Sequence, residues 1–165
     1  ITCRDWSSDV CSSDLINFTD KAPDYNVMCR AYRNGTQSGV VSGAATKVEL
    51  NAEDYDIGSD FDSTTNYRFV APVDGYYDIF AVVYWSSGDN GIRHDTILRL
   101  NGSSYITIAT LYPGATAGFS NPTHWRGWLD ASDYIELIAR QYSGSNRSIA
   151  GEIRLTYMEV MLVST

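Results

Sequence analysis

With 165 residues, 44% of them apolar and 13% aromatic, the chain is long enough to bury the core of one ordinary domain. Its formal net charge of −8 opposes a phosphate backbone, so we expect no nucleic-acid partner. The longest apolar run, Ile79–Trp85, has the length of a strand and is far shorter than the roughly 20 apolar residues of a membrane-spanning helix, which argues against membrane insertion.

The first residues differ in character from the rest of the chain. Asp5 to Leu15, DWSSDVCSSDL, match without a mismatch the translation of a sequencing-library adapter in one reading frame. We therefore interpret 1–15 as an artefactual or disordered tail, 16–26 as a linker and 27–165 as the domain, and expect natural sequence upstream to be missing. On this interpretation Cys3 and Cys11 have no function. The remaining cysteine, Cys29, is expected to be a small buried apolar residue.

From Val27 onward, short β-rich runs alternate with turn residues, and no long helical period occurs. We predict an all-β fold, an antiparallel jelly-roll sandwich of about ten strands. Asn101-Gly102 is a predicted hairpin turn because both residues tolerate positive φ, and Pro72–Gly75 is predicted to be a similar tight turn. The predicted strands are Val27–Tyr32, Thr46–Leu50, Tyr67–Ala71, Gly75–Trp85, Thr96–Leu100, Tyr105–Leu111, Thr123–Leu129, Tyr134–Gln141 and Ile149–Val163.

The predicted strand Gly75–Trp85 is largely apolar on both faces. One face carries Tyr77, Ile79, Ala81, Val83 and Trp85, and the other carries Tyr76, Asp78, Phe80, Val82 and Tyr84. A strand with one face in water should alternate apolar and polar residues. We therefore expect the second face to be covered, either by another subunit of a homotrimer or by a loop, and favour the subunit.

The connections between predicted strands alternate strictly between short and long. The short ones are Pro72–Asp74, Asn101–Ser104 and Asp130–Asp133, and the long ones are Ser86–Asp95, Tyr112–Pro122 and Tyr142–Ser148. If successive strands are antiparallel, all three long loops lie at one end, opposite the C-terminus. We call this end the apex and expect function there, because a scaffold usually carries function on its elaborated loops. The candidate ligand-binding residues are Asp89, Asn90, Arg93, Tyr112, Phe119, Asn121, His124, Tyr142 and Arg147.

Three segments carry a family likeness: NYRFVAPVDGYY with Phe69, Ala71-Pro72, Gly75 and Tyr77; ASDYIEL, with Ser132 in place of a family glycine; and the closing TYMEVMLV. In these segments the chain resembles complement-one-q heads, relatives of the tumour-necrosis-factor fold. With AYRNGTQSG early and NYRFVAPVDGYY in the middle, the chain looks most like bacterial and bacteriophage members of this group. Those members are commonly C-terminal modules of tail fibres or surface proteins. The resemblance implies a trimeric ten-strand jelly roll with its termini at one end and binding loops at the other.

Motifs of enzyme chemistry are not found. The sequence contains no G-x-S-x-G, H-E-x-x-H or P-loop pattern. His94 and Asp95 are adjacent, so on a strand they point to opposite faces and cannot form a catalytic dyad. We expect a protein that is not an enzyme.

An acidic segment, AEDYDIGSDFDSTTN, holds Asp54, Asp56, Asp60 and Asp62. It is superficially similar to a calcium loop, but the twelfth position from Asp54 is Thr65 and not the bidentate Glu that such loops need. We favour a solvated acidic loop and no cofactor, with Ca²⁺ binding as the alternative.

These observations predict a non-enzymatic trimeric recognition head, the receptor- or glycan-binding tip of a phage tail fibre or bacterial surface protein. Its partners would be two further copies of the chain and a host cell-surface receptor or glycan, and its location would be extracellular or on the virion surface. Trp125, Trp128 and the tyrosines could stack on sugar rings, although such aromatic residues more often pack in the core or between subunits. Two alternatives remain open: a structural module that trimerises a fibre, and a calcium-dependent lectin-like module.

Overall fold

A computed structural model of the chain describes residues 26–165. The interpretation of 1–15 as a tail, nearly all of the expected linker, and Cys3 and Cys11 lie outside the described residues. Within 26–165 the secondary structure consists of thirteen strands, and no helix there is long and apolar enough to cross a membrane. The strands are β1 Met28–Tyr32, β2 Gln37–Val40, β3 Thr46–Lys47, β4 Ala52–Ile57, β5 Phe61–Asp62, β6 Arg68–Val70, β7 Gly75–Trp85, β8 His94–Leu100, β9 Ser104–Leu111, β10 Phe119–Leu129, β11 Tyr134–Gln141, β12 Arg147–Ile149 and β13 Tyr157–Ser164.

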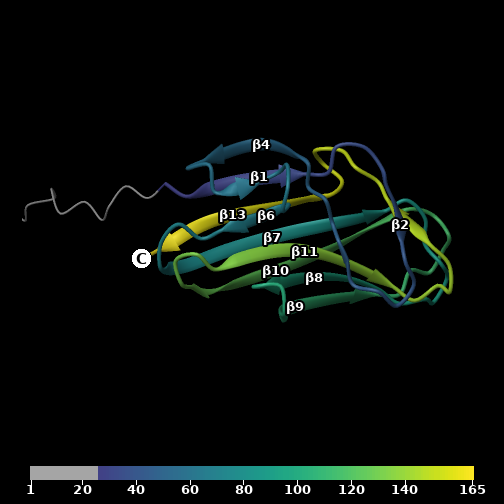
Figure 1. Ribbon diagram of the computed structural model, residues 1–165. Helices are drawn as coiled ribbons and strands as arrows, with labels where there is room; N and C mark the ends of the chain where they lie inside the picture. The colour runs from purple at the N-terminus through teal and green to yellow at the C-terminus, as the bar shows by residue number, and fades with distance from the viewer. Residues whose placement is uncertain (1–25) are drawn as a thin grey trace, which may run out of the picture.

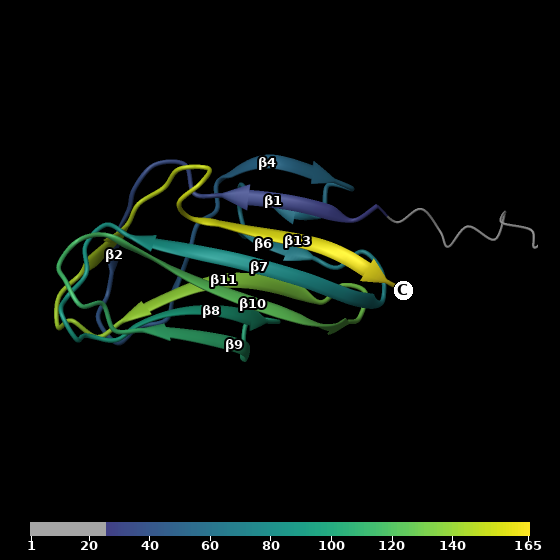
Figure 2. The same ribbon diagram turned by 180° about the vertical axis from the view of Figure 1, so that it is seen from behind.

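The strands form two antiparallel sheets that pack face to face, which confirms the predicted sandwich (Figures 1 and 2). One sheet has seven strands in the order β2-β12-β7-β13-β1-β4, with β10 paired to β7. The other has six strands in the order β5-β6-β11-β8-β9, with β3 paired to β11. The long strand β7 therefore lies inside its sheet, with β10 and β13 on its two sides.

The core lies between the two sheets and follows the period-two alternation of the strands. On β7 the side chains of Tyr77, Ile79, Ala81, Val83 and Trp85 are completely buried, as the sequence predicts for one face. Each large apolar side chain buried in this way contributes about 1.5–3 kcal/mol relative to exposure. The hydroxyl of Tyr77 stays satisfied inside because it donates to the carbonyl of Val73 at 2.8 Å. Cys29 is buried in the same core, as expected.

Two tight connections differ in kind. Asn101 and Gly102 have φ of 49° and 71°, which confirms the predicted hairpin turn between β8 and β9. The connection Pro72–Asp74 is short, but it links β6 of one sheet to β7 of the other and is not a hairpin. Ser132 has a φ of 77°, the left-handed conformation that glycine adopts most easily, at the position where the resemblance implies a glycine.

Several of the predicted elements need correction. The acidic residues expected in a solvated loop lie partly in a strand, because Ala52–Ile57 forms β4 and pairs with β1. The predicted strand Ile149–Val163 is two strands, β12 and β13, since the chain turns between them at Glu152–Leu155. A Cβ at Gly151 would collide with the carbonyl oxygen of Gly35, so the chain passes another segment closely there. Strands β2 and β5 were not predicted at all.

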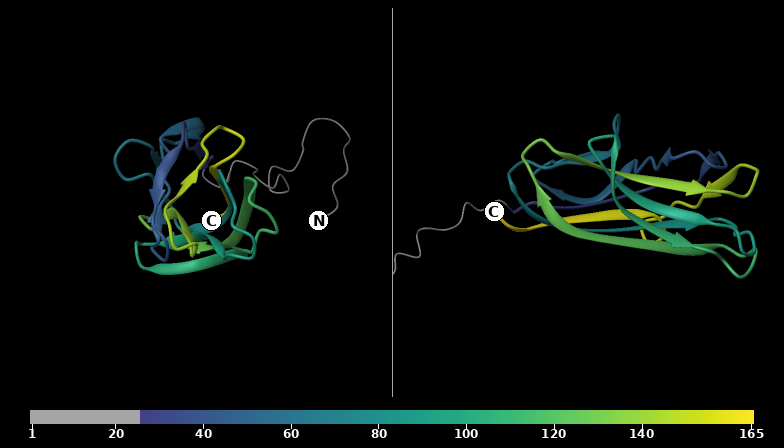
Figure 3. Two further views of the ribbon diagram at one scale, coloured as in Figure 1. Left: turned by 90° about the vertical axis from the view of Figure 1, so that its right-hand side faces the viewer. Right: turned by 90° about the horizontal axis from the view of Figure 1, so that it is seen from below.

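The long loops gather at one end of the sandwich, as the alternation of connections predicts. Trp85 at the end of β7 lies opposite Phe119, and His94 at the start of β8 lies opposite both Leu111 and Gln141. The C-terminus lies at the other end (Figure 1), and the left panel of Figure 3 looks onto the loop end. A fourth segment joins this end, because Gly43 donates its backbone N–H to the carbonyl of Gln141 at 2.6 Å.

Candidate functional site at the apex

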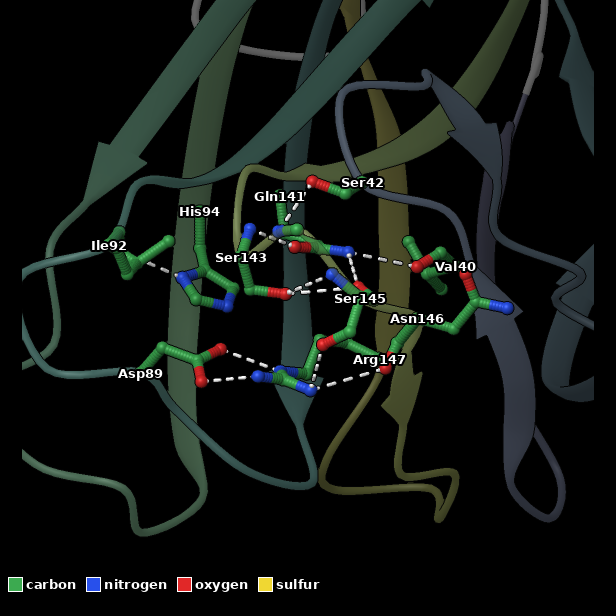
Figure 4. A network of polar contacts seen from close by, with 11 residues as sticks. Val40, Ser42, Asp89, Ile92, His94, Gln141, Ser143, Ser145, Asn146 and Arg147 are labelled. Atoms are coloured by element: carbon green, nitrogen blue, oxygen red, sulfur yellow. Dashed lines mark hydrogen bonds and ion pairs between the residues drawn. The ribbon is translucent and has the colours of Figure 1, made fainter.

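An ion pair ties two apex loops together. Arg147, at the start of β12, donates its Nε–H to Asp89 Oδ2 at 2.6 Å and an Nη2–H to Asp89 Oδ1 (Figure 4). Its Nη1 donates to the hydroxyl of Ser145 at 2.9 Å. The guanidinium holds the pKa of the Asp89 carboxyl below its ordinary value. These two predicted site residues therefore come together, and they fix the loops that carry them.

A buried glutamine fastens the segment around Val40 to the loop that follows β11. Gln141, at the end of β11, donates its Nε2–H groups to the carbonyls of Val40 at 3.0 Å and Ser145 at 2.8 Å. Its Oε1 accepts the backbone N–H of Ser143 at 2.6 Å (Figure 4). Because all of its side-chain groups have partners, the glutamine can be buried without an unpaired polar group. The apex is therefore a set of braced loops.

His94 lies beneath these loops as a packed, neutral side chain. Its ring stands edge-on between Trp85, at 4.8 Å between ring centroids, and Phe119, at 5.1 Å. Its Nδ1 lies 3.0 Å from the carbonyl of Ile92, so this nitrogen carries the proton in the neutral ring. Burial lowers the pKa of His94 below its ordinary value of 6.5. Asp95 points to the other side of β8, as the strand alternation predicts, and contacts Arg93, Thr110 and Arg140.

Three of the predicted binding residues lie in β10, which begins at Phe119, and not in the apex loops. Phe119 packs against the core, and Asn121 is buried and donates to the carbonyls of His94 and Ala109, both at 3.1 Å. His124 lies well inside β10, opposite Phe80, and its Nε2 contacts Asp78 at 2.7 Å. These side chains hold the sandwich together or lie on its flank.

Several of the remaining predicted residues are exposed at the apex. Asn90 is exposed, Arg93 is partly exposed, and Tyr112 and Tyr142 are 59% and 42% exposed. Val41 and Leu111 are further exposed apolar side chains at this end, and the sequence reasoning missed both. We define the apex patch as Val41, Leu111, Tyr112 and Tyr142. Val41 was missed because only the pairing of β2 with β12 brings its segment here, and no local pattern indicates that pairing.

The acidic residues use their carboxylates to shape turns. Asp56 accepts the backbone N–H of Asp60 at 3.1 Å and of Phe61 at 2.9 Å. Asp62 accepts backbone N–H groups of Thr64, Thr65 and Asn66, and these hydrogen bonds hold the pKa of Asp62 well below its ordinary range. Asp54 is exposed on β4. Within residues 26–165, no three His, Cys, Asp or Glu side chains are grouped to hold a metal ion.

The outer face of the seven-stranded sheet carries exposed aromatic side chains. Tyr76 is 50% exposed and lies 5.2 Å from the ring of Trp128, which is 47% exposed. Phe80 is 37% exposed, so the described loops do not cover this face as one alternative expected. Val82 and Tyr84 are more protected. A shallow hollow of about 220 Å³ lies in this face, lined by Met28, Asp78, Phe80, Glu159 and Met161.

The sequence matches no protein-family model and no curated protein. Three solved structures are similar in fold to the chain. Eiger TNF from S. frugiperda has 10% sequence identity and a TM-score of 0.65, over 84% of this chain and 92% of that one. Murine APRIL at pH 5.0 has 11% identity and a TM-score of 0.65, over 84% and 99% of the two chains. The globular domain of zebrafish complement 1qA has 12% identity and a TM-score of 0.57, over 83% and 97%. The chain therefore has the jelly-roll fold shared by these tumour-necrosis-factor and complement-one-q structures.

Proposed function

We propose that the chain is a non-enzymatic recognition head that forms a homotrimer and binds its partner through the apex patch. The observation that carries this proposal is the convergence of the long loops at one end, where braced loops expose Tyr112, Tyr142 and Val41. Tyrosine offers a large contact area at a low cost in side-chain entropy, and such residues are enriched in binding surfaces. Bracing lowers the entropy that the loops lose on binding.

The trimer would form through the outer face of the seven-stranded sheet, which we call the subunit face and define by Tyr76, Phe80, Trp128 and Met161. These four side chains are between 37% and 50% exposed in the single chain. The centre of a stable interface is typically aromatic and depleted in charge. The charge of Asp78 on this face is already paired with Arg126 and His124, so it does not stand alone among these side chains. Three copies of the apex patch, each binding weakly, would gain avidity from the trimer.

The sequence likeness supports a setting as the receptor- or glycan-binding tip of a phage tail fibre or a bacterial surface protein. In that setting the head acts outside the cell or on the virion surface, and its partner is a host cell-surface receptor or glycan. A purely structural role in trimerising a fibre is the second candidate. The exposed subunit face favours it, since that role would need no binding by the apex patch. A calcium-dependent lectin is less well supported, because Asp56 and Asp62 already accept backbone hydrogen bonds.

The apex hypothesis is tested with a variant that carries Val41→Ser and Tyr112→Ser. Both side chains are at least half exposed, so their loss should leave the fold and the trimer intact. The labelled protein is applied to a glycan array and to fixed bacterial cells, with Ile57→Ser as the control. Ile57 is 45% exposed and pairs with Met28 away from the apex. The double variant should lose binding and the control should keep it, whereas equal binding by both would support the structural role.

A further inference from the structure

A row of four cations runs across the outer face of the six-stranded sheet. We call Lys47, Arg93, Arg99 and Arg140 the basic row. They surround two buried carboxylates, Asp95 and Glu136, whose side chains are 0% and 4% exposed. The four cations and two carboxylates of this group sum to a charge of +2, whereas the whole chain has −8. The basic row is therefore a locally positive patch on an acidic protein.

The buried carboxylates hold the cations in fixed positions. Asp95 accepts hydrogen bonds from Arg93 Nε at 2.8 Å, Arg140 Nε at 3.0 Å and Thr110 Oγ1 at 2.7 Å. Burial alone would raise the pKa of Asp95, but these hydrogen bonds outweigh it and hold the pKa below its ordinary value. The Arg93–Asp95 bond uses only the Nε–H of Arg93, whose side chain is 37% exposed. Its terminal N–H groups are thus available for an anion outside the protein.

The second carboxylate repeats the arrangement further along the strands. Glu136 accepts Arg99 Nε at 2.9 Å and Arg99 Nη2 at 2.8 Å, and it also pairs with the ammonium of Lys47. Lys47 is 33% exposed, so it is the accessible cation beside Glu136. Arg93 has the same position beside Asp95. Arg140, beside Asp95, and Glu136 are four residues apart on β11, so their Cα atoms are separated by about 13 Å at the rise of a strand.

Tyrosine rings flank the cations. The Arg140 guanidinium carbon lies 5.7 Å from the ring centroid of Tyr142 and 5.8 Å from that of Tyr105, and Arg93 lies 5.3 Å from Tyr142. Tyr105 and Tyr142 are each 42% exposed. A sugar ring has an apolar C–H face that can pack on such a ring, while its charged substituent reaches a neighbouring cation. Fixed guanidinium groups beside exposed tyrosines therefore suit an anionic sugar.

We propose that this face binds a linear polysaccharide whose sugars carry carboxylates, a polyuronate, with separate carboxylates at the Arg93–Arg140 and Lys47–Arg99 pairs. The two pairs lie along one strand direction, so a chain with a repeated charge can engage both, whereas a single acidic sugar can engage only one. Guanidinium groups bind planar carboxylates well because two N–H groups can donate in parallel. This inference rests on the proposed function, a recognition head, and names the ligand class and a second contact surface beside the apex patch.

The probe is a long oligogalacturonate, compared with the same chain after methyl esterification, which keeps the sugar backbone and removes the charge. Titration calorimetry on the full chain should show binding of the oligogalacturonate, weaker binding of the galacturonic acid monomer, and none of the methyl ester. Added salt should weaken the binding, because charge attraction on this exposed surface is screened. Lys47→Gln and Arg93→Gln should each lower the affinity about tenfold, which is typical of losing a hydrogen bond to a charged group.

Both substitutions spare the fold, since Glu136 keeps Arg99, and Asp95 keeps Arg140 and Thr110. Circular dichroism on each variant checks this point. The matched control is Arg154→Gln, which removes the same charge from a side chain that is 80% exposed on the β12–β13 connection. Its affinity should stay within about twofold of the parent, because an exposed charge outside the site contributes little.

The inference is overturned if the oligogalacturonate does not bind, if the methyl ester binds equally well, or if Arg154→Gln weakens binding as much as the two variants in the basic row. A preference for dextran sulfate or for DNA would also overturn it, since either would assign the face to another class of polyanion. The proposed function is tested separately by the variant with Val41→Ser and Tyr112→Ser. Failure of oligogalacturonate binding beside an apex-dependent signal on cells would remove only this inference.

Discussion

Arg147 on β12 donates hydrogen bonds to both carboxylate oxygens of Asp89 in the loop after β7, and this pair locks two apex loops together. Both side chains are a little over one-fifth exposed, so water partly screens the pair. Arg147→Gln should therefore lower the free energy of unfolding by at most about 1 kcal/mol. The larger effect should be local: amide hydrogen exchange in 86–93 and 142–146 should become faster. Unchanged exchange in both loops would show that the pair does not brace the apex.

His94 should make the stability of the fold depend on pH in a defined window. Its folded-state pKa is lowered by burial, so the unfolded chain takes up the proton first as the pH falls. The free energy of unfolding should therefore be fully present above about pH 6.5 and decline below it until the folded-state pKa is reached. Thermal melts at pH values between 7.5 and 5 measure this decline, because this is the pH range in which a histidine changes its charge.

His94→Phe should flatten that part of the profile, because phenylalanine keeps an aromatic ring between Trp85 and Phe119 and does not titrate. The matched control is His124→Gln, at the histidine whose side chain is 56% exposed, and it should keep the decline. A profile that flattens in the control and not in His94→Phe would contradict the assignment. The lowered pKa values of Asp78, Asp89 and Asp95 act separately, and their contribution is lost only as the pH falls below about 4.

Asp95→Asn should be among the most destabilising changes on the six-stranded sheet. It removes the charge that balances Arg93 and Arg140, and breaking a buried ion pair typically costs about 3–5 kcal/mol. The midpoint of urea unfolding should shift accordingly. Glu152→Gln is the control, because its pair with Arg154 is exposed and should contribute nothing measurable. Equal midpoints for the two variants would mean that Asp95 does not organise the basic row.

Calcium should not stabilise the domain. The oxygens of Asp56 and Asp62 accept backbone hydrogen bonds in the turns around β5, so a cation would have to compete with the fold for them. We expect the same melting temperature with EDTA and with millimolar CaCl₂. A rise in melting temperature with calcium that Asp62→Asn abolishes would restore the lectin-like alternative.

The sequence predicts the long interior strands best. The limits of β7 and β11 agree with the predicted Gly75–Trp85 and Tyr134–Gln141, because strongly apolar strands in the middle of a sheet show their alternation locally. Strand β10 begins four residues earlier than predicted. Pro122 cannot donate a backbone hydrogen bond to a sheet, but within the described residues β10 pairs with β7 alone and tolerates it. That shift moved Phe119 and Asn121 from the predicted apex loop into the sandwich.

The candidate site is predictable only in outline. The alternation of short and long connections was enough to place Tyr112, Tyr142 and Arg147 at one end, because antiparallel topology fixes which end each loop occupies. Two features depend on pairing between distant segments, and neither leaves a local pattern. One is β4, whose polar residues become a strand by pairing with β1, and the other is the approach of Val41 to the apex. The basic row likewise combines residues from β3, β8, β11 and the loop before β8.

Sedimentation equilibrium at micromolar concentration tests the central claim, a trimeric head assembled through the subunit face, most directly. We expect three times the monomer mass for the parent chain and for Ile108→Ser, a matched exposed apolar change on the other sheet. The pair Tyr76→Ser and Phe80→Ser should give the monomer mass with the strand content unchanged, because both side chains are exposed in the single chain. A parent chain that sediments as a monomer, or a trimer that persists in the Tyr76 and Phe80 variant, would contradict the account.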